Sequence, residues 1–190
     1  MKLEDDGKRS LKPCRAEVNN PHVDWDYSWK LTNLKGLSST EQTFLWKMLH
    51  NLLPTPARLI HMKMKNAPDP LCPFCDERSQ ADLTHSLLTC PYNKEVTSWL
   101  MAILHVHLPN LQAHQVVHFD LGQLEDSIEL PLVWLIGNTL SLVWDSRKEK
   151  KKPGQHKTRS SLEAKISILR KTRYSNAATI LETFPNLSLF

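Results

Sequence analysis

Three cysteines and one histidine lie close together in the middle of the chain, at spacings typical of metal sites. Cys72 and Cys75 form a Cys-x-x-Cys pair, nine residues separate Cys75 from His85, and four separate His85 from Cys90. Zinc prefers thiolate and imidazole ligands in a tetrahedron, and a Cys-x-x-Cys turn lets two thiolates bind one ion. The spacing therefore predicts one zinc ion held by these four side chains.

Two other interpretations use the same residues. They are three buried cysteines beside a core histidine, and a redox disulfide between Cys72 and Cys75; the disulfide is disfavoured because no βαβ pattern surrounds the pair. Three cysteines and one histidine fill all four zinc positions, whereas a hydrolytic zinc keeps one position open for water. We therefore expect a structural zinc and no catalytic residues. Cys14, in a polar segment, is interpreted as a free thiol.

Basic residues are concentrated in the C-terminal part of the chain. From residue 145 to residue 173 there are eleven Lys or Arg and three Asp or Glu, although the net charge of the whole chain is only +4. Such clusters either neutralise phosphates or form a solvated helix surface. The candidate nucleic-acid contacts are Arg58, Lys63, Arg147, Lys148, Lys150, Lys151, Lys152, Lys157, Arg159, Arg170, Lys171 and Arg173.

Two aromatic residues flank the cysteines. Phe74 lies within the Cys-x-x-Cys pair, and Tyr92 follows Cys90. Aromatic rings stack on unpaired bases in proteins that bind single strands. For Phe74, packing beneath the metal loop is at least as good an interpretation, and for Tyr92 the two are equal.

The overall composition is that of an ordinary folded protein, with 41% hydrophobic and 23% charged residues. The charged first residues contain no apolar signal sequence. The longest apolar stretch, Leu130–Trp144, is shorter than the ~20 residues a bilayer requires, so we expect a buried helix there and no membrane contact. Clustered cysteines without a secretory signal favour a reducing, intracellular location, in the nucleus or the cytoplasm.

Apolar residues at helical spacing predict most of the secondary structure, and local signals set the helix ends. Ser38 with Glu41 has the spacing of a capping box, and Thr55 before Pro56 is a second start signal. Trp25, Tyr27 and Trp29 alternate with polar residues, which fits an extended segment or a short helix equally. Residues 118–121 fit a short strand or a turn. The expected helices cover about 38–53, 55–64, 81–88, 93–105, 110–117, 129–150 and 160–183.

These elements predict a mainly α fold, in which a small zinc-stapled helical domain is followed by a C-terminal helical hairpin. The scarcity of glycine, five against twelve prolines, agrees with helices joined by Pro-containing loops. The expected organisation is a loose polar leader over residues 1–24, the zinc-binding helical domain over 25–108, and a helical region with a basic turn over 109–190.

Around the cysteines the sequence resembles a known family. The run FLWKMLHNLLPT and the later run LCPFCDERSQADLTHSLLTCPYNKEVTSWL are similar to the zinc-binding region that follows the polymerase in LINE-type non-LTR retrotransposons. That pattern is an aromatic-rich helix, a Leu-Pro-Thr turn, a pair of cysteines, an acidic residue before a histidine, a further cysteine and a helix with a tryptophan. In this chain, Asp82 holds the acidic position and Trp99 the tryptophan position. The match covers about residues 25–105.

The resemblance implies a nucleic-acid-binding accessory module of a reverse transcriptase. Its partners would be template RNA or single-stranded or nicked target DNA, with the reverse-transcriptase domain of the same element as a further possibility. The chain contains no YxDD motif and no endonuclease motif, so we expect no enzymatic activity. The alternative is a zinc-stabilised scaffold that docks on a polymerase or a host protein.

Overall fold

Helices make up the regular structure of the described part of the chain. The computed structural model describes residues 20–75 and 78–148, and in these ranges it contains only two isolated β-bridges and no strand. The mainly α class is therefore confirmed. The α-helices are α2 (Trp25–Thr32), α3 (Ser39–Leu49), α4 (Pro56–His61), α5 (Lys94–His107), α6 (Ala113–His118) and α7 (Asp126–Lys148); η1 (His85–Thr89) is a π-helix and η2 (Pro91–Asn93) a 3₁₀-helix.

The helix starts that the sequence predicted at Ser38 and Thr55 are confirmed. The Ser38 hydroxyl accepts the Glu41 N–H at 3.3 Å, and the Glu41 carboxylate accepts the Ser38 N–H at 2.7 Å. The Thr55 hydroxyl accepts the Arg58 N–H at 3.2 Å, with Pro56 as the first helical residue. Both starts are local, because the capping partners are three residues apart.

In three segments the structure either differs from the sequence prediction or decides between two predictions. The tryptophan-rich segment that fitted two interpretations is helical, and Asp24 caps it by accepting the Tyr27 N–H at 3.0 Å. Helix α4 ends at His61, earlier than expected, since Lys63 takes a left-handed conformation with φ 54°. Phe119, also left-handed, ends α6, so the segment after it is a turn and not a strand.

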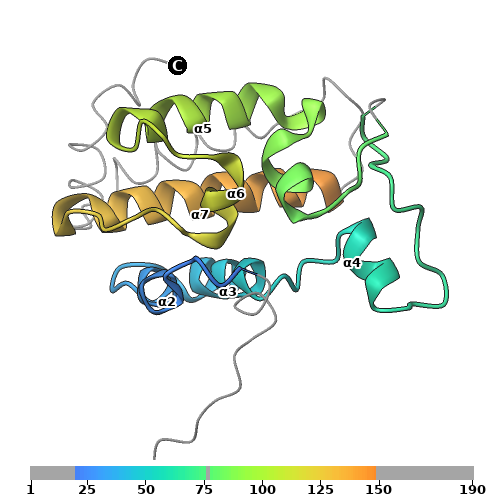
Figure 1. Cartoon of the computed structure of the whole chain (residues 1–190), viewed down its shortest axis with the longest axis horizontal. Coiled ribbons are helices and arrows are strands. Elements are labelled where there is room, and N and C mark those ends of the chain that lie inside the picture. The colour runs from blue at the N-terminus through green and yellow to red at the C-terminus, as the bar shows by residue number, and fades with distance from the viewer. Residues whose placement is uncertain (1–19, 76–77, 149–190) are drawn as a thin grey trace, which may run out of the picture.

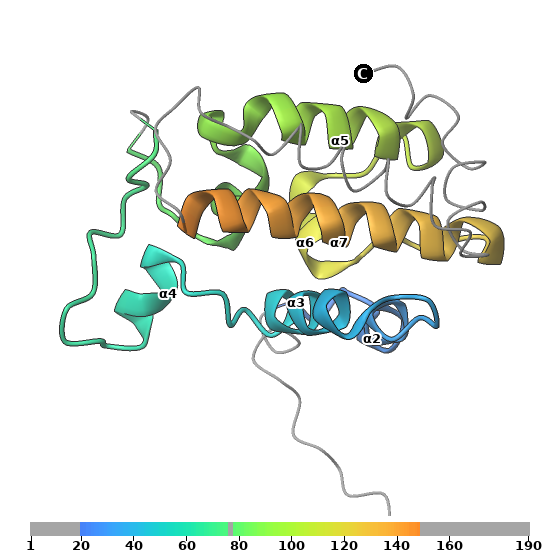
Figure 2. The same ribbon diagram turned by 180° about the vertical axis from the view of Figure 1, so that it is seen from behind.

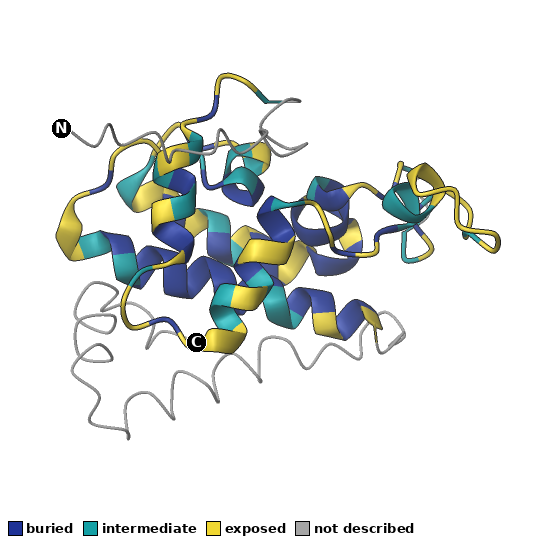
Figure 3. Cartoon of the chain, turned by 90° about the horizontal axis from the view of Figure 1, so that it is seen from below, coloured by how far each residue is buried: buried dark blue, intermediate teal, exposed yellow. Residues whose placement is uncertain are grey.

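Helix α7 is the central element of the fold. Figures 1 and 2 show it between α5 on one side and α2 and α3 on the other. Almost every residue from Pro131 to Leu140 is buried (Figure 3). By length and composition α7 is apolar enough to cross a membrane, but 67% of its most apolar window is buried inside the structure. The expected buried helix is therefore confirmed, since such burial is typical of a core helix.

One hydrophobic core includes residues from both sides of the expected domain boundary at residue 108. It joins Leu31, Leu45 and Leu100 to Leu135 and Leu140. Gly137 lets α3 approach α7 closely, because a β-carbon at this position would lie 3.2 Å from a Leu45 methyl group. The end of α7 thus packs in the same core as the helices that flank the cysteines.

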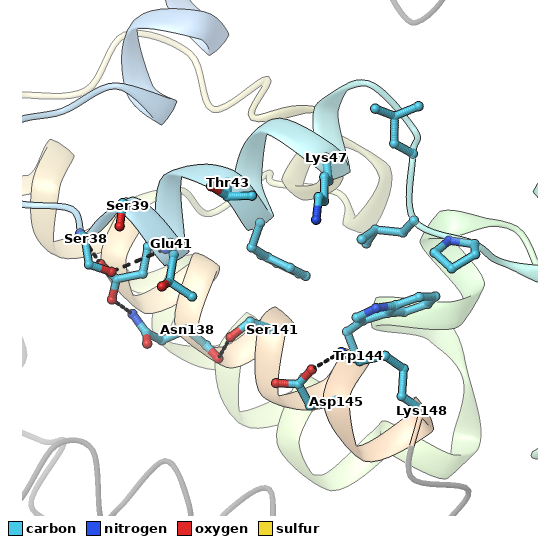
Figure 4. A pocket seen from close by; sticks show the side chains of 15 residues that line it. Ser38, Ser39, Glu41, Thr43, Lys47, Asn138, Ser141, Trp144, Asp145 and Lys148 are labelled. Atoms are coloured by element: carbon cyan, nitrogen blue, oxygen red, sulfur yellow. Dashed lines mark hydrogen bonds and ion pairs between the residues drawn. The ribbon is translucent and has the colours of Figure 1, made fainter.

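A polar contact and a surface groove also lie between α3 and α7. The Asn138 amide donates to the Glu41 carboxylate at 2.7 Å, which links the capping box of α3 to the middle of α7. Beside this contact the surface is hollowed into a groove of about 750 Å³ (Figure 4). Phe44, Leu53 and Trp144 give it an apolar part, and Lys47 and Lys148 lie at its rim.

A second polar network ties α2 to the start of α7. The Tyr27 hydroxyl donates to the buried Glu129 carboxylate at 2.8 Å and accepts the Leu124 N–H at 2.9 Å. The Lys30 ammonium reaches the same carboxylate oxygen at 2.9 Å. Burial, together with the hydrogen bond to Glu129 and the nearby acidic charges, outweighs the Leu124 N–H bond and raises the pKa of Tyr27 to about 12.

Replacing Tyr27 by phenylalanine is expected to lower the free energy of unfolding by about 1–3 kcal/mol, because it leaves the Leu124 N–H without its partner and leaves the buried Glu129 oxygen with Lys30 alone. Urea denaturation followed by circular dichroism measures the change. Lys30→Met serves as the comparison: the lysine side chain is 54% exposed, so its loss should lower stability by less than about 1 kcal/mol. Equal effects of the two substitutions would contradict this account.

Several expectations concern residues outside the described part of the chain. They are the leader before residue 20, the helix over 160–183, Cys14, and the basic residues Lys150, Lys151, Lys152, Lys157, Arg159, Arg170, Lys171 and Arg173.

Candidate metal centre

A short hairpin-like loop carries the first two cysteines. Leu71 and Gln80 form an antiparallel bridge, in which Cys72 N–H donates to the Ser79 carbonyl at 2.9 Å and Ala81 N–H to the Pro70 carbonyl at 2.8 Å. The chain turns between these two residues, and Arg78 takes a left-handed φ of 47°. These backbone bonds place Cys72 and Cys75 on one turn.

A widened helical turn places the other two side chains. Asp82 accepts the His85 N–H at 2.7 Å and so caps the short helix that leads into η1. The Cys90 N–H then donates to the His85 carbonyl at 2.9 Å, a bond between residues five apart. The acidic residue just before the histidine therefore has a local structural role, and the expected helix from about 81 to 88 is present as this π-helical segment.

The four side chains converge at one point. Their ligand atoms all lie within 4.8 Å of one another, with Cys72 Sγ 3.7 Å from Cys90 Sγ and Cys75 Sγ 3.5 Å from His85 Nε2. A tetrahedral zinc with usual bond lengths separates two sulfurs by about 3.8 Å and a sulfur and a nitrogen by about 3.5 Å. Both measured separations match these values, so the cluster is suited to one zinc ion.

The alternative interpretations of the cysteines do not fit this geometry. All three cysteines are free thiols, which contradicts the disulfide between Cys72 and Cys75. Three thiols and an imidazole facing one point are also more than a chance arrangement in a core.

A buried arginine lies against the cluster. Arg147, near the end of α7, is only 6% exposed, and its Nη2 donates to Cys72 Sγ at 3.3 Å. Its guanidinium also lies over the Phe74 ring, 4.4 Å from the centroid. The expectation that Arg147 contacts phosphate is therefore wrong for this structure, because its charge is directed inward onto a thiol.

The arginine changes the acidity of the thiols. Burial raises the pKa of Cys72, but hydrogen bonds from Arg147, the Phe74 backbone and His85 outweigh it and lower that pKa to about 6. Burial dominates at Cys90 and raises the pKa of its thiol. One thiol is thus prepared as a thiolate near neutral pH, the form that binds metal.

Sequence reasoning missed the role of Arg147 because it belongs to a run of basic residues, of which Lys148 is exposed. A signal was nevertheless present, since Leu140, Val143 and Arg147 follow one another at helical spacing on the buried face of α7. The aromatic residues pack as one of their two interpretations predicted: the rings of Phe74 and Tyr92 are 5.0 Å apart, and Tyr92 is buried.

The remaining described basic candidates lie on the surface. Arg58 is half-buried and lines a pocket of about 240 Å³ between α4 and the residues just after the cysteine loop. Lys63 is exposed in the turn that follows α4. Lys148 is exposed and forms an ion pair with Asp145 at 2.6 Å. The cluster thus brings together all four predicted ligands, whereas the predicted basic residues are spread over two regions.

Comparison with known families agrees with this site. Residues 15–99 match the family model described as zinc-binding in reverse transcriptase. No curated protein sequence and no solved structure matches the chain. The matched segment contains all four cluster residues and ends within α5. Residues 15–99 are therefore similar to this zinc-binding family, and the similarity agrees with one zinc ion held by the four cluster residues.

Proposed function

We propose that this protein is an accessory module of a LINE-type retrotransposon reverse transcriptase, which contacts template RNA or target DNA and has no catalytic activity of its own. The observation that carries the proposal is an exposed basic segment from His61 to Lys65, which follows a helix hydrogen-bonded to the chain next to the cysteine loop. The family match supports the zinc-binding part, and the charge and exposure of this segment support the nucleic-acid part.

The basic segment has the features of a surface that binds single strands. The chain carries no acidic residue between Glu41 and Asp69. His61, Lys63 and Lys65 are exposed and alternate with Met62 and Met64, whose side chains are 55% and 51% exposed. Cations neutralise phosphates, and neighbouring apolar side chains suit the faces of unpaired bases.

The zinc cluster fixes the position of this segment relative to the rest of the domain. The Ala57 N–H of α4 donates to the Ala81 carbonyl, next to the cysteine loop, at 3.4 Å. Figure 1 shows α4 apart from the stacked helices α2, α3, α5 and α7, and Figure 3 shows the chain after it as exposed. A folded zinc loop would therefore hold the basic segment in one place.

The absence of catalysis in the proposal rests on the ligand set. Cys72, Cys75, His85 and Cys90 supply four protein ligands to a tetrahedral ion, so no position remains for a reacting water. The polymerase domain of the same element would supply the chemistry, and the module would act with it inside the cell, in the nucleus or the cytoplasm.

Charge reversal at Lys65 tests the nucleic-acid contact. Lys65→Glu is expected to weaken binding to a single-stranded RNA or DNA oligonucleotide of mixed sequence and to make the slope of log affinity against log salt shallower by about 0.7 or more. Fluorescence anisotropy at several salt concentrations measures both. Lys35→Glu makes the same charge change at an exposed residue between α2 and α3 and should have a smaller effect.

The basic run that follows α7 is tested separately by reversing Lys150, Lys151 and Lys152 together. Weaker binding in this triple variant would assign part of the contact to the C-terminal run. If neither Lys65→Glu nor the triple variant changes affinity, the nucleic-acid function is rejected.

A second candidate function is a zinc-stabilised scaffold that docks on a polymerase or host protein. Exposed apolar side chains favour it, namely Trp46, Leu52, Ile60, Met62 and Met64. Surface apolar groups that gather together are typical of protein interfaces. In this case Met62→Ser with Met64→Ser would abolish co-purification with the reverse-transcriptase domain, while the purified chain would bind no RNA or DNA at all.

A further inference from the structure

The zinc cluster and Arg147 carry opposite charges. Three thiolates, one neutral imidazole and one divalent cation sum to a net charge of −1. Cys72 and Cys90 are buried, and Arg147 is buried beside them. Removing either charge alone from water costs free energy. When both are buried in good geometry, the attraction between them offsets much of this desolvation cost.

We propose that Arg147 is the counter-cation of the zinc centre, and that it couples occupancy of the cysteine cluster to the position of the C-terminal end of α7. The proposal concerns the zinc site alone and does not depend on nucleic-acid binding.

The contacts of the guanidinium support this role. Its Nη2 lies 3.3 Å from Cys72 Sγ, within hydrogen-bonding range of a sulfur acceptor. Its flat face lies on Phe74, which sits inside the Cys-x-x-Cys pair. Nη1 is buried and has no hydrogen-bond partner among the described residues. Among the described residues, the Cys72 and Cys90 sulfurs and the Phe74 ring thus interact with the charge of Arg147.

The coupling spans two distant parts of the chain. Arg147 is 75 residues from Cys72 in sequence, and α7 packs directly against η1, which begins with the ligand His85. An ion shared by the four cluster residues would fix the position of the Cys72 sulfur and give the centre one net negative charge, so Arg147 and the last turn of α7 would be held more firmly. Without the ion, the four side chains are not tied to one point, and the hold on that turn is weaker.

Zinc affinity, measured by competition with a chromogenic chelator, tests the proposal. Arg147→Met keeps the apolar stem and removes the charge, and it is expected to weaken zinc binding by ~10–100-fold, the usual effect of removing a group that contacts a metal ligand. Arg147→Lys keeps the charge and should lose less. Lys148→Met removes the same charge from the next residue, which is exposed, and should bind zinc as the unsubstituted chain does.

Hydrogen exchange followed by mass spectrometry provides a readout that simple packing would not change. In the unsubstituted chain, zinc should slow exchange at the amides of residues 144–148, and this protection should be smaller in Arg147→Lys. If Arg147→Met fails to fold, the proposal can still be tested, because the zinc dependence of hydrogen exchange is measured in the unsubstituted chain.

Two results would overturn the proposal. One is equal zinc affinity in Arg147→Lys and Arg147→Met, since the charge would then not matter. The other is exchange at residues 144–148 that does not respond to zinc.

Discussion

Replacing Cys75 by serine is expected to abolish stoichiometric zinc binding and to unfold the segment from about residue 70 to residue 92. Leu83, Leu87 and Leu88 of this segment join the main core, but the cysteine loop packs only in a small apolar cluster of Cys72, Ala81, Cys90 and Tyr92, with Phe74 against it. In small zinc domains the binding free energy, about 10–16 kcal/mol, is largely the free energy of folding. Metal content and hydrogen exchange over this segment measure the result.

The chain supplies a matched control for this substitution. Cys14 is the fourth cysteine and is not one of the four cluster residues. Cys14→Ser should keep one zinc per chain and the same exchange pattern. One zinc per chain and an unchanged melting curve in Cys75→Ser would refute the site.

The second large effect is expected in the core between α3 and α7. Leu45 is fully buried and lies against Gly137, so Leu45→Ala would leave a cavity between α3 and α7. Such truncations lower the free energy of unfolding by about 2–5 kcal/mol. Chemical denaturation of the zinc-loaded chain measures the loss.

An exposed residue of the same helix provides the comparison. Thr43 is exposed on α3, and Thr43→Ala should change stability by about 0.5 kcal/mol or less. A loss below about 1 kcal/mol in Leu45→Ala would mean that α3 does not pack on α7 as the structure has it.

The features that sequence predicted correctly depend on residues close together in the chain. The capping partners at Ser38 and Thr55 are three residues away, and the four cluster residues lie within one short segment. The chemistry of the second pattern is specific, because three cysteines and one histidine close together supply all four ligands of one tetrahedral zinc ion. The apolar run at Leu130–Trp144 was equally informative, because a helix that is apolar all round has to be buried.

The features that sequence left open depend on contacts between distant residues. Trp25, Tyr27 and Trp29 satisfy a helical or an extended pattern, and the choice is made by tertiary contacts such as Tyr27 with Glu129, 102 residues away. The inward direction of Arg147 likewise depends on where α7 packs. The basic residues around Arg147 suggested an exposed side chain. Its position on the buried face of α7 was the stronger signal, and it indicated a buried side chain.

The π-helical turn between His85 and Cys90 limits how this region can change in length. In an α-helix, residues five apart point about 140° away from each other around the axis, so two ligands at this spacing would face different sides. The wider turn, closed by the bond from Cys90 N–H to the His85 carbonyl, lets both reach one ion. Insertion of a single residue here would place the two ligands six residues apart, about 120° from each other around an α-helix, and would rotate Cys90 away from His85. The number of residues between these two ligands therefore cannot increase without a change in the turn that joins them.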